Sequence, residues 1–186
     1  MVQLPEPTPI DSAARKDGYK VISQIGIERI RKVLKNLTSI SKKELKLYPN
    51  QDYGFRCFTL SESNYTEWEP YSGKDTQQLE LRLGKAETPL VEGWTPENLL
   101  SEILLLQGFP LDSRVTVLPE FKANTVQQVT SEFVGHHLYV CLDKKVKAET
   151  VAKLSLRAED ILVCLDSALS DEAKVNLADR CNLKVI

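Results

Sequence analysis

Two aspartates that each follow an apolar strand-like run are the residues of this chain best placed to do chemistry. The sequence Cys-Leu-Asp occurs twice, ending at Asp143 and at Asp166. Neighbouring parallel strands end at one edge of a sheet, where α/β proteins bind their ligands. Two carboxylates at that edge could hold Mg²⁺ or act in acid–base chemistry. The alternative is that each aspartate caps the turn or helix that follows it.

Histidines and cysteines give little indication of a metal or nucleophilic centre. His136 and His137 are adjacent, so on a strand their rings point to opposite faces and cannot easily share one metal. A turn or surface position is the favoured interpretation. The cysteines form no Cys-x-x-Cys pair, which indicates buried, reduced thiols rather than a zinc site or a disulfide. They are Cys57, Cys141, Cys164 and Cys181.

Basic residues are concentrated between Arg29 and Lys46, where seven of them stand against the single acid Glu44. This stretch could contact DNA phosphates, and a solvated helix face is the alternative. Its lack of aromatic residues argues against base recognition by stacking. The segment 51–104 holds ten acids against four bases, so nucleic acid is not bound over the whole surface. The candidate phosphate contacts are Arg29, Arg31, Lys32 and Lys35.

Aromatic residues interrupt the polar stretch Ser61–Gly73 at Tyr65, Trp68 and Tyr71. Aromatic side chains in polar loops often anchor protein–protein interfaces. They could equally cover the hydrophobic core. Both interpretations stay open from the sequence.

Hydrophobic spacing predicts the elements that would position these residues. Apolar residues at helical spacing predict an amphipathic helix from near Val21 to Leu37, after a strand end and a proline-rich linker over residues 1–18. Tyr53–Leu60 is predicted to be a strand. Gln78–Leu83 fits a strand or a helical turn equally well. Thr95–Gly108 is predicted to be a largely buried helix, with Thr95 as its N-cap.

The C-terminal third is predicted to be a small α/β unit. Apolar strands that alternate with helices favour parallel pairing and right-handed crossovers. The fold class is therefore α/β, with a mixed sheet whose C-terminal strand–helix repeat forms a small parallel sheet. A hairpin joins Thr125–Phe133 to His137–Leu142. The other predicted strands are Arg114–Leu118, Ile161–Asp166 and Leu183–Ile186, and the helices are Ala148–Arg157 and one that begins at Ser170.

Composition limits the class of protein. With 186 residues, 42% hydrophobic and 27% charged, the chain suits one globular domain, or one domain with an appendage. It has no apolar run of the ~20 residues that a membrane span needs, and it does not start with a signal pattern. We therefore expect a cytoplasmic protein without a membrane partner.

Four segments, in this order, resemble the C-terminal end of the Mod subunit of type III restriction–modification systems. That subunit is a site-specific adenine DNA methyltransferase that uses S-adenosylmethionine. The resemblance covers most of the chain and is most specific in the first 70 residues and in the fourth segment. The segments are VQLPEP (Val2–Pro7), GYKVISQIGIERIRKVLKNL (Gly18–Leu37), GFRCFTLSESNYTEWEP (Gly54–Pro70) and LLSEILLLQGFPL (Leu99–Leu111).

The resemblance implies a division of the chain and an absence of catalysis. Residues 1–38 would be the remnant of a methyltransferase domain, and residues 39–186 a C-terminal assembly domain. By position, Gln3 would face the cofactor ribose in the complete subunit. Methyltransferases of this class need an Asp-Pro-Pro-Tyr loop and a Gly-x-Gly loop. The chain has no Asp-Pro pair and no Gly-x-Gly. We therefore expect no catalytic residue, metal or cofactor in this chain alone.

The resemblance also implies partners, namely a second Mod subunit, the Res helicase–nuclease subunit, and DNA through the complete subunit. Ile30, on the predicted amphipathic helix, is then an interface candidate. The runner-up hypothesis is a stand-alone α/β enzyme or ligand-binding protein that uses Asp143 and Asp166. A third hypothesis is a DNA-binding module built on the basic helix.

Overall fold

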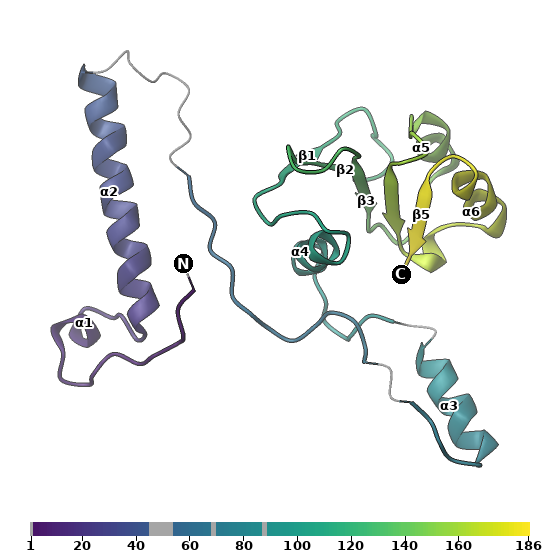
Figure 1. Ribbon diagram of the computed structural model, residues 1–186, viewed down its shortest axis with the longest axis horizontal. Helices are drawn as coiled ribbons and strands as arrows, with labels where there is room; N and C mark the ends of the chain where they lie inside the picture. Colours follow the sequence, from purple (N-terminus) through teal and green to yellow (C-terminus); the bar gives the residue numbers. More distant parts are fainter. Residues whose placement is uncertain (1, 45–53, 68–69, 87–88) are drawn as a thin grey trace. The chain divides into compact units, whose positions relative to one another are not determined.

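The computed structural model describes residues 2–44, 54–67, 70–86 and 89–186. The chain divides into two compact units, Met1–Thr59 and Leu60–Ile186, and each is described by itself (Figure 1). The boundary expected after residue 38 falls inside a helix of the first unit.

The first unit is a long helix preceded by a folded N-terminal loop. Its helices are α1 (Ala13–Lys16) and α2 (Ile22–Glu44). The expected strand end is present only as one antiparallel bridge between Pro7 and Val21, because proline has no N–H with which to continue a ladder. The buried Thr8 closes the loop, since its hydroxyl donates to the carbonyl of Tyr19 at 2.6 Å.

Two predictions for this unit were wrong or incomplete. The expected linker contains the short helix α1, which begins because the Ser12 hydroxyl accepts the Arg15 N–H. Residues 54–60 lie in no strand, which contradicts the predicted strand Tyr53–Leu60, and Tyr53 itself lies outside the described residues. Aromatic and small residues do alternate in this segment, but residues 54–60 pair with no neighbouring strand. The helix from near Val21 is confirmed and runs beyond its expected end at Leu37.

The second unit contains a five-stranded mixed sheet in the order β1-β2-β3-β4-β5, so the predicted α/β fold is confirmed. β1 to β3 pair antiparallel, and β3 to β5 pair parallel, as expected from the strand–helix repeat. The crossovers between the parallel strands contain α5 (Ala148–Lys153) and α6 (Asp171–Ala178). The strands are β1 (Arg114–Val117), β2 (Gln127–Thr130), β3 (Leu138–Cys141), β4 (Ile161–Cys164) and β5 (Asn182–Val185).

Helices cover both faces of the sheet, and this explains why β3 and β4 are apolar at every position (Figure 1). Val140 and Val163 face one cluster with α4 (Pro96–Leu106), whereas Tyr139 and Leu162 face a second cluster on the α5–α6 side. α4 forms as expected, because the Thr95 hydroxyl accepts the Asn98 N–H at its start. Gly108, with φ +76°, takes the left-handed conformation that ends the helix.

The ambiguous segment Gln78–Leu83 lies in the helix α3 (Thr76–Ala86). Leu79 and Leu83 therefore belong to a helical repeat rather than a strand alternation. No helix of the described residues is long and apolar enough to cross a membrane.

The cysteines give a first prediction. Burial raises the pKa values of Cys141, Cys164 and Cys181. The prediction of a buried thiol was wrong for Cys57, which is exposed. Because the thiolate is the reactive form, we expect a thiol reagent such as Ellman's reagent to modify one thiol in the native protein and all four in denaturant. Cys57→Ser should abolish the fast native reaction. Rapid modification of more than one native thiol would contradict the buried placement.

Candidate functional site

Glu102, on α4, holds the polar segment that precedes α3. Its carboxylate accepts hydrogen bonds from the Ser63 hydroxyl, from the Asn64 backbone N–H at 2.7 Å and from the Asn64 side-chain amide at 2.8 Å. Burial raises the pKa of Glu102, but these three hydrogen bonds outweigh it and leave the pKa below its usual value. The carboxylate is therefore a fixed anchor for this segment.

Tyr65 continues the attachment that Glu102 begins. It forms an antiparallel bridge with Leu90, and the flanking Asn64 carbonyl accepts the Val91 N–H at 2.9 Å. Its ring packs against the cluster on the α4 side of the sheet. The segments Gly54–Pro70 and Leu99–Leu111, which are far apart in sequence, are thus joined through Glu102.

This contact gives a second prediction. Glu102→Ala should release the Asn64 region without unfolding the sheet, because it removes the acceptor of hydrogen bonds made by one peripheral segment. We expect a local loss of about 1.4 kcal/mol, which is about tenfold faster hydrogen exchange at the Asn64 amide. Glu97→Gln, on the exposed first turn of the same helix, is the matched control and should leave that amide unchanged. If the Asn64 amide exchanges at the same rate in the Glu102→Ala protein as in the unsubstituted protein, Glu102 does not anchor this segment.

Asp143 contacts a network that ties two loops together. One of its carboxylate oxygens accepts the Asn124 side-chain amide at 2.7 Å and the Thr125 N–H at 2.9 Å. The buried Asn124 also donates to the Lys145 carbonyl and accepts from the Lys147 N–H and the Thr150 hydroxyl. The carboxylate of Asp143 therefore holds the loop before β2, rather than capping the turn or helix that follows it.

Asp166 has a different environment from Asp143. It begins the 3₁₀ turn Asp166–Ala168, its backbone N–H donates to the Ile186 carbonyl, and its exposed carboxylate pairs with Lys174 at 2.8 Å. The described residues contain no group of three or more His, Cys, Asp or Glu side chains placed to hold a metal ion. The two aspartates do end neighbouring strands, but each is engaged with its own loop or helix.

The adjacent histidines have separate surroundings. The His136 ring meets Phe109 edge-on, with ring centroids 5.5 Å apart. The His137 ring lies 3.3 Å from the Gln128 amide, and its backbone N–H donates to the buried carboxylate of Asp160 at 2.9 Å. Both histidines precede β3, at a bend that includes His136, rather than lying within a strand, as the favoured turn position predicts.

The remaining candidates lie outside the sheet. Gln3 is exposed, and residues 2–6 form no strand that would place it at a sheet edge. Tyr71 exchanges hydrogen bonds with the backbone of Asp75, and the Arg82 guanidinium lies over its ring at 5.3 Å from the centroid. Trp68 lies outside the described residues. Tyr71 thus contacts Asp75, just before α3, and Arg82 within it, and an interface role for Tyr71 stays a prediction.

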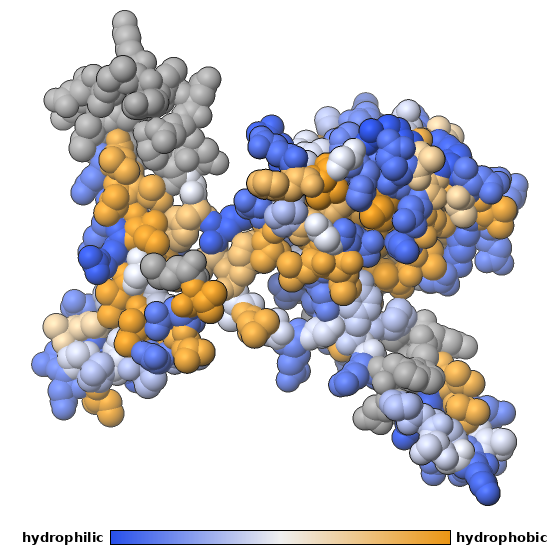
Figure 2. Space-filling view, viewed as in Figure 1, coloured by the Kyte–Doolittle hydropathy of each residue, from blue (hydrophilic) through white to orange (hydrophobic). Residues whose placement is uncertain are grey.

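α2 presents both basic and apolar side chains to solvent. The candidate phosphate contacts Arg29, Arg31, Lys32 and Lys35 are exposed, and Arg31 makes a weak ion pair with Glu28 at 3.9 Å. Ile30 is 40% exposed and Val33 is 55% exposed. Figure 2 shows orange, apolar side chains along α2 beside blue, hydrophilic ones. A helix with this much exposed apolar surface has a face that is suited to a partner.

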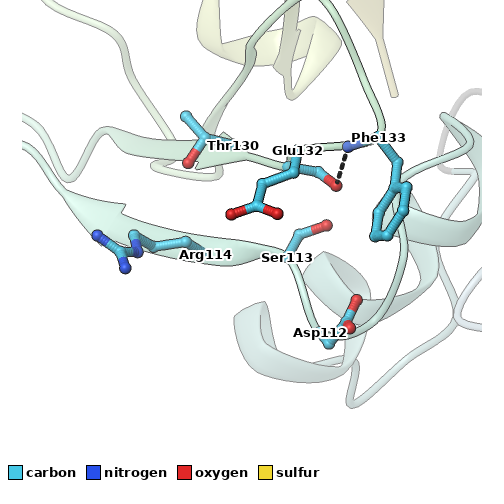
Figure 3. Close-up of a pocket in the computed structure, with 7 residues that line it drawn as sticks. Asp112, Ser113, Arg114, Thr130, Glu132 and Phe133 are labelled. Atoms are coloured by element: carbon cyan, nitrogen blue, oxygen red, sulfur yellow. Dashed lines mark hydrogen bonds between the residues drawn. The ribbon is translucent and has the colours of Figure 1, made fainter. Parts of the chain in front are cut away.

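One hollow was not predicted from the sequence. It has a volume of about 510 Å³ and lies where β1 begins and β2 ends. Figure 3 shows the Glu132 carboxylate between Thr130 and Ser113, with Arg114 and Phe133 on opposite sides. Its lining combines the carboxylates of Asp112 and Glu132 with the Arg114 guanidinium and several hydroxyl groups, and these residues lie where β1 begins and β2 ends.

Comparisons of the chain with protein-family models, with curated proteins and with solved structures found no match.

Proposed function

We propose that this chain is an assembly module of a type III Mod DNA methyltransferase. The observation that carries the proposal is the row of exposed apolar residues on α2, which leaves a surface of the kind that obligate partners cover. The resemblance places this helix in the methyltransferase part of the Mod subunit. The module would contribute to pairing of Mod subunits and to association with Res.

The contact made by Glu102 supports the same proposal. Glu102 lies in one of the segments that carry the resemblance, and its partner Asn64 lies in another. The contact therefore gives a structural reason for both segments to be present in one chain. The runner-up hypothesis, a ligand site at Asp143 and Asp166, has no comparable support, because the Asp143 carboxylate is already hydrogen-bonded to Asn124 and Thr125. S-adenosylmethionine and DNA would be bound by the complete subunit.

The test is reconstitution with the methyltransferase segment of a Mod subunit, supplied as a separate chain. We expect neither chain alone to transfer methyl groups from S-adenosylmethionine to DNA, and the mixture to do so. The double variant Val33→Ser/Leu37→Ser should reduce the transfer, whereas Leu81→Ser on α3 should not. Methyl transfer at the same rate with and without this chain would refute the proposal.

A further inference from the structure

The exposed apolar residues of α2 form a narrow stripe. With 3.6 residues per turn, the stripe covers about 80° of the helix circumference and is about 22 Å long. Its residues are Ile22, Gly26, Ile30, Val33 and Leu37. The four large side chains are 40–55% exposed, and a Cβ on Gly26 would meet nothing within 4 Å. The half-buried Ile25, Ile27 and Leu34 continue the apolar face of α2 on both sides of this stripe.

Positive charge borders this stripe. Arg29 lies about 20° beyond its edge and Lys32 about 80° beyond it on the same side. Residues 22–37 contain four basic side chains and the single acid Glu28, which gives a net charge of +3. The Glu28–Arg31 pair, at 3.9 Å, is too long and too exposed to neutralise the helix strongly.

This charge disfavours a second copy of α2 as the occupant. In an antiparallel pair joined through the stripe, the basic sides of two α2 helices would meet within a Debye length of about 10 Å, and like charges would repel. In a parallel pair, each basic side would face Ile27 and Leu34 of the other copy, where it meets no acidic residue. An acidic partner would instead gain from the same residues. The charge therefore selects a partner of opposite sign.

The composition of the stripe favours a protein over a lipid surface. Helices that lie in a membrane interface commonly present Trp or Phe, and α2 contains no aromatic residue. Gly26, in the middle of the stripe, permits close approach of another backbone, which a lipid surface does not require. We propose that α2 docks an acidic amphipathic α-helix along this stripe. The inference rests on the proposed function, because it names the chemistry of the partner surface in the assembly.

The test uses two designed amphipathic peptides with the same leucine seam, one flanked by glutamate and the other by lysine. Titrated into the whole chain by fluorescence anisotropy, the glutamate peptide should bind at least about tenfold more tightly. Its binding should weaken as salt rises from about 50 to about 500 mM. Val33→Ser/Leu37→Ser should abolish binding, and Leu81→Ser, an exposed leucine of α3, should not; circular dichroism verifies that both variants keep their helices.

Three results would overturn the inference. These are equal binding of the two peptides, binding that survives the double substitution, and the absence of binding. Sedimentation of the chain with phosphatidylglycerol vesicles in preference to the glutamate peptide would assign the stripe to a lipid surface instead. Reconstituted methyl transfer can succeed in any of these cases, so failure of this inference is distinguishable from failure of the proposed function.

Discussion

Replacing Asp160 with alanine is expected to lower the free energy of unfolding by about 3 kcal/mol, because it removes a buried carboxylate that accepts hydrogen bonds from two backbone N–H groups and from the Arg157 guanidinium. Asp160 is 1% exposed and comes immediately before β4. Its carboxylate accepts the backbone N–H groups of His137 and Arg157 and a charged hydrogen bond from the Arg157 guanidinium at 2.8 Å. Denaturant titration followed by circular dichroism measures the loss.

Glu159→Gln is the matched control for Asp160. Glu159 pairs with the same Arg157 at 3.1 Å, but both side chains are about half exposed, so we expect a change below about 0.5 kcal/mol. Similar losses for the two variants would mean that Asp160 contributes only as a surface charge.

The stability contributed by Asp160 should depend on pH. Burial raises the pKa of Asp160, but the hydrogen bonds from Arg157 and His137 lower it more, so its folded pKa lies below the unfolded value. The unfolded chain then binds the proton more readily. The contribution is fully present above about pH 4 and is lost as the pH falls further. The stability difference between the native protein and Asp160→Ala should therefore shrink in acid, and a constant difference would contradict the assignment.

Asn124→Ala is expected to cost about 2–4 kcal/mol, because one buried amide satisfies four groups. These groups are the Asp143 carboxylate, the Lys145 carbonyl, the Lys147 N–H and the Thr150 hydroxyl. Since they lie in the loop after β3 and at the start of α5, the substitution removes the link between these elements and the loop before β2. Thermal unfolding measures the effect.

The control for Asn124→Ala exchanges the amide and the carboxylate between positions 124 and 143. Asn124→Asp would place a second carboxylate against Asp143, so it should destabilise the protein more at neutral pH than in acid. Adding Asp143→Asn should recover part of the loss, since a donor again faces an acceptor. If the two substitutions are simply additive, the network as described here is wrong.

Periodicity predicted the elements with strong local signals. The apolar runs of β3 and β4 and the capped apolar helix α4 were found from sequence, because burial on both faces requires apolar residues at every position. The segment ending at Leu60 was predicted wrongly as a strand, because a strand also needs a neighbour, which alternation alone does not supply. α1 was missed because four residues give no detectable period.

The polar contacts that organise the candidate site could not be predicted in the same way. Glu102 is a charged residue between the apolar residues of α4, which is a usable signal, but its partners lie 38 and 39 residues away. Asp160 and Asn124 are ordinary loop residues in sequence, and only the fold reveals that they are buried. Asp143 and Asp166 were correctly placed after strands, yet their hydrogen-bond partners come from other segments.

We propose that this chain assembles with the methyltransferase part of a Mod subunit. Size-exclusion chromatography with light scattering, on the chain alone and mixed with that separate segment, tests it most directly. We predict a mixture whose molar mass equals a stoichiometric complex of the two chains and whose complex is lost with Val33→Ser/Leu37→Ser. Two species that elute unchanged, each at its own mass, would contradict the account.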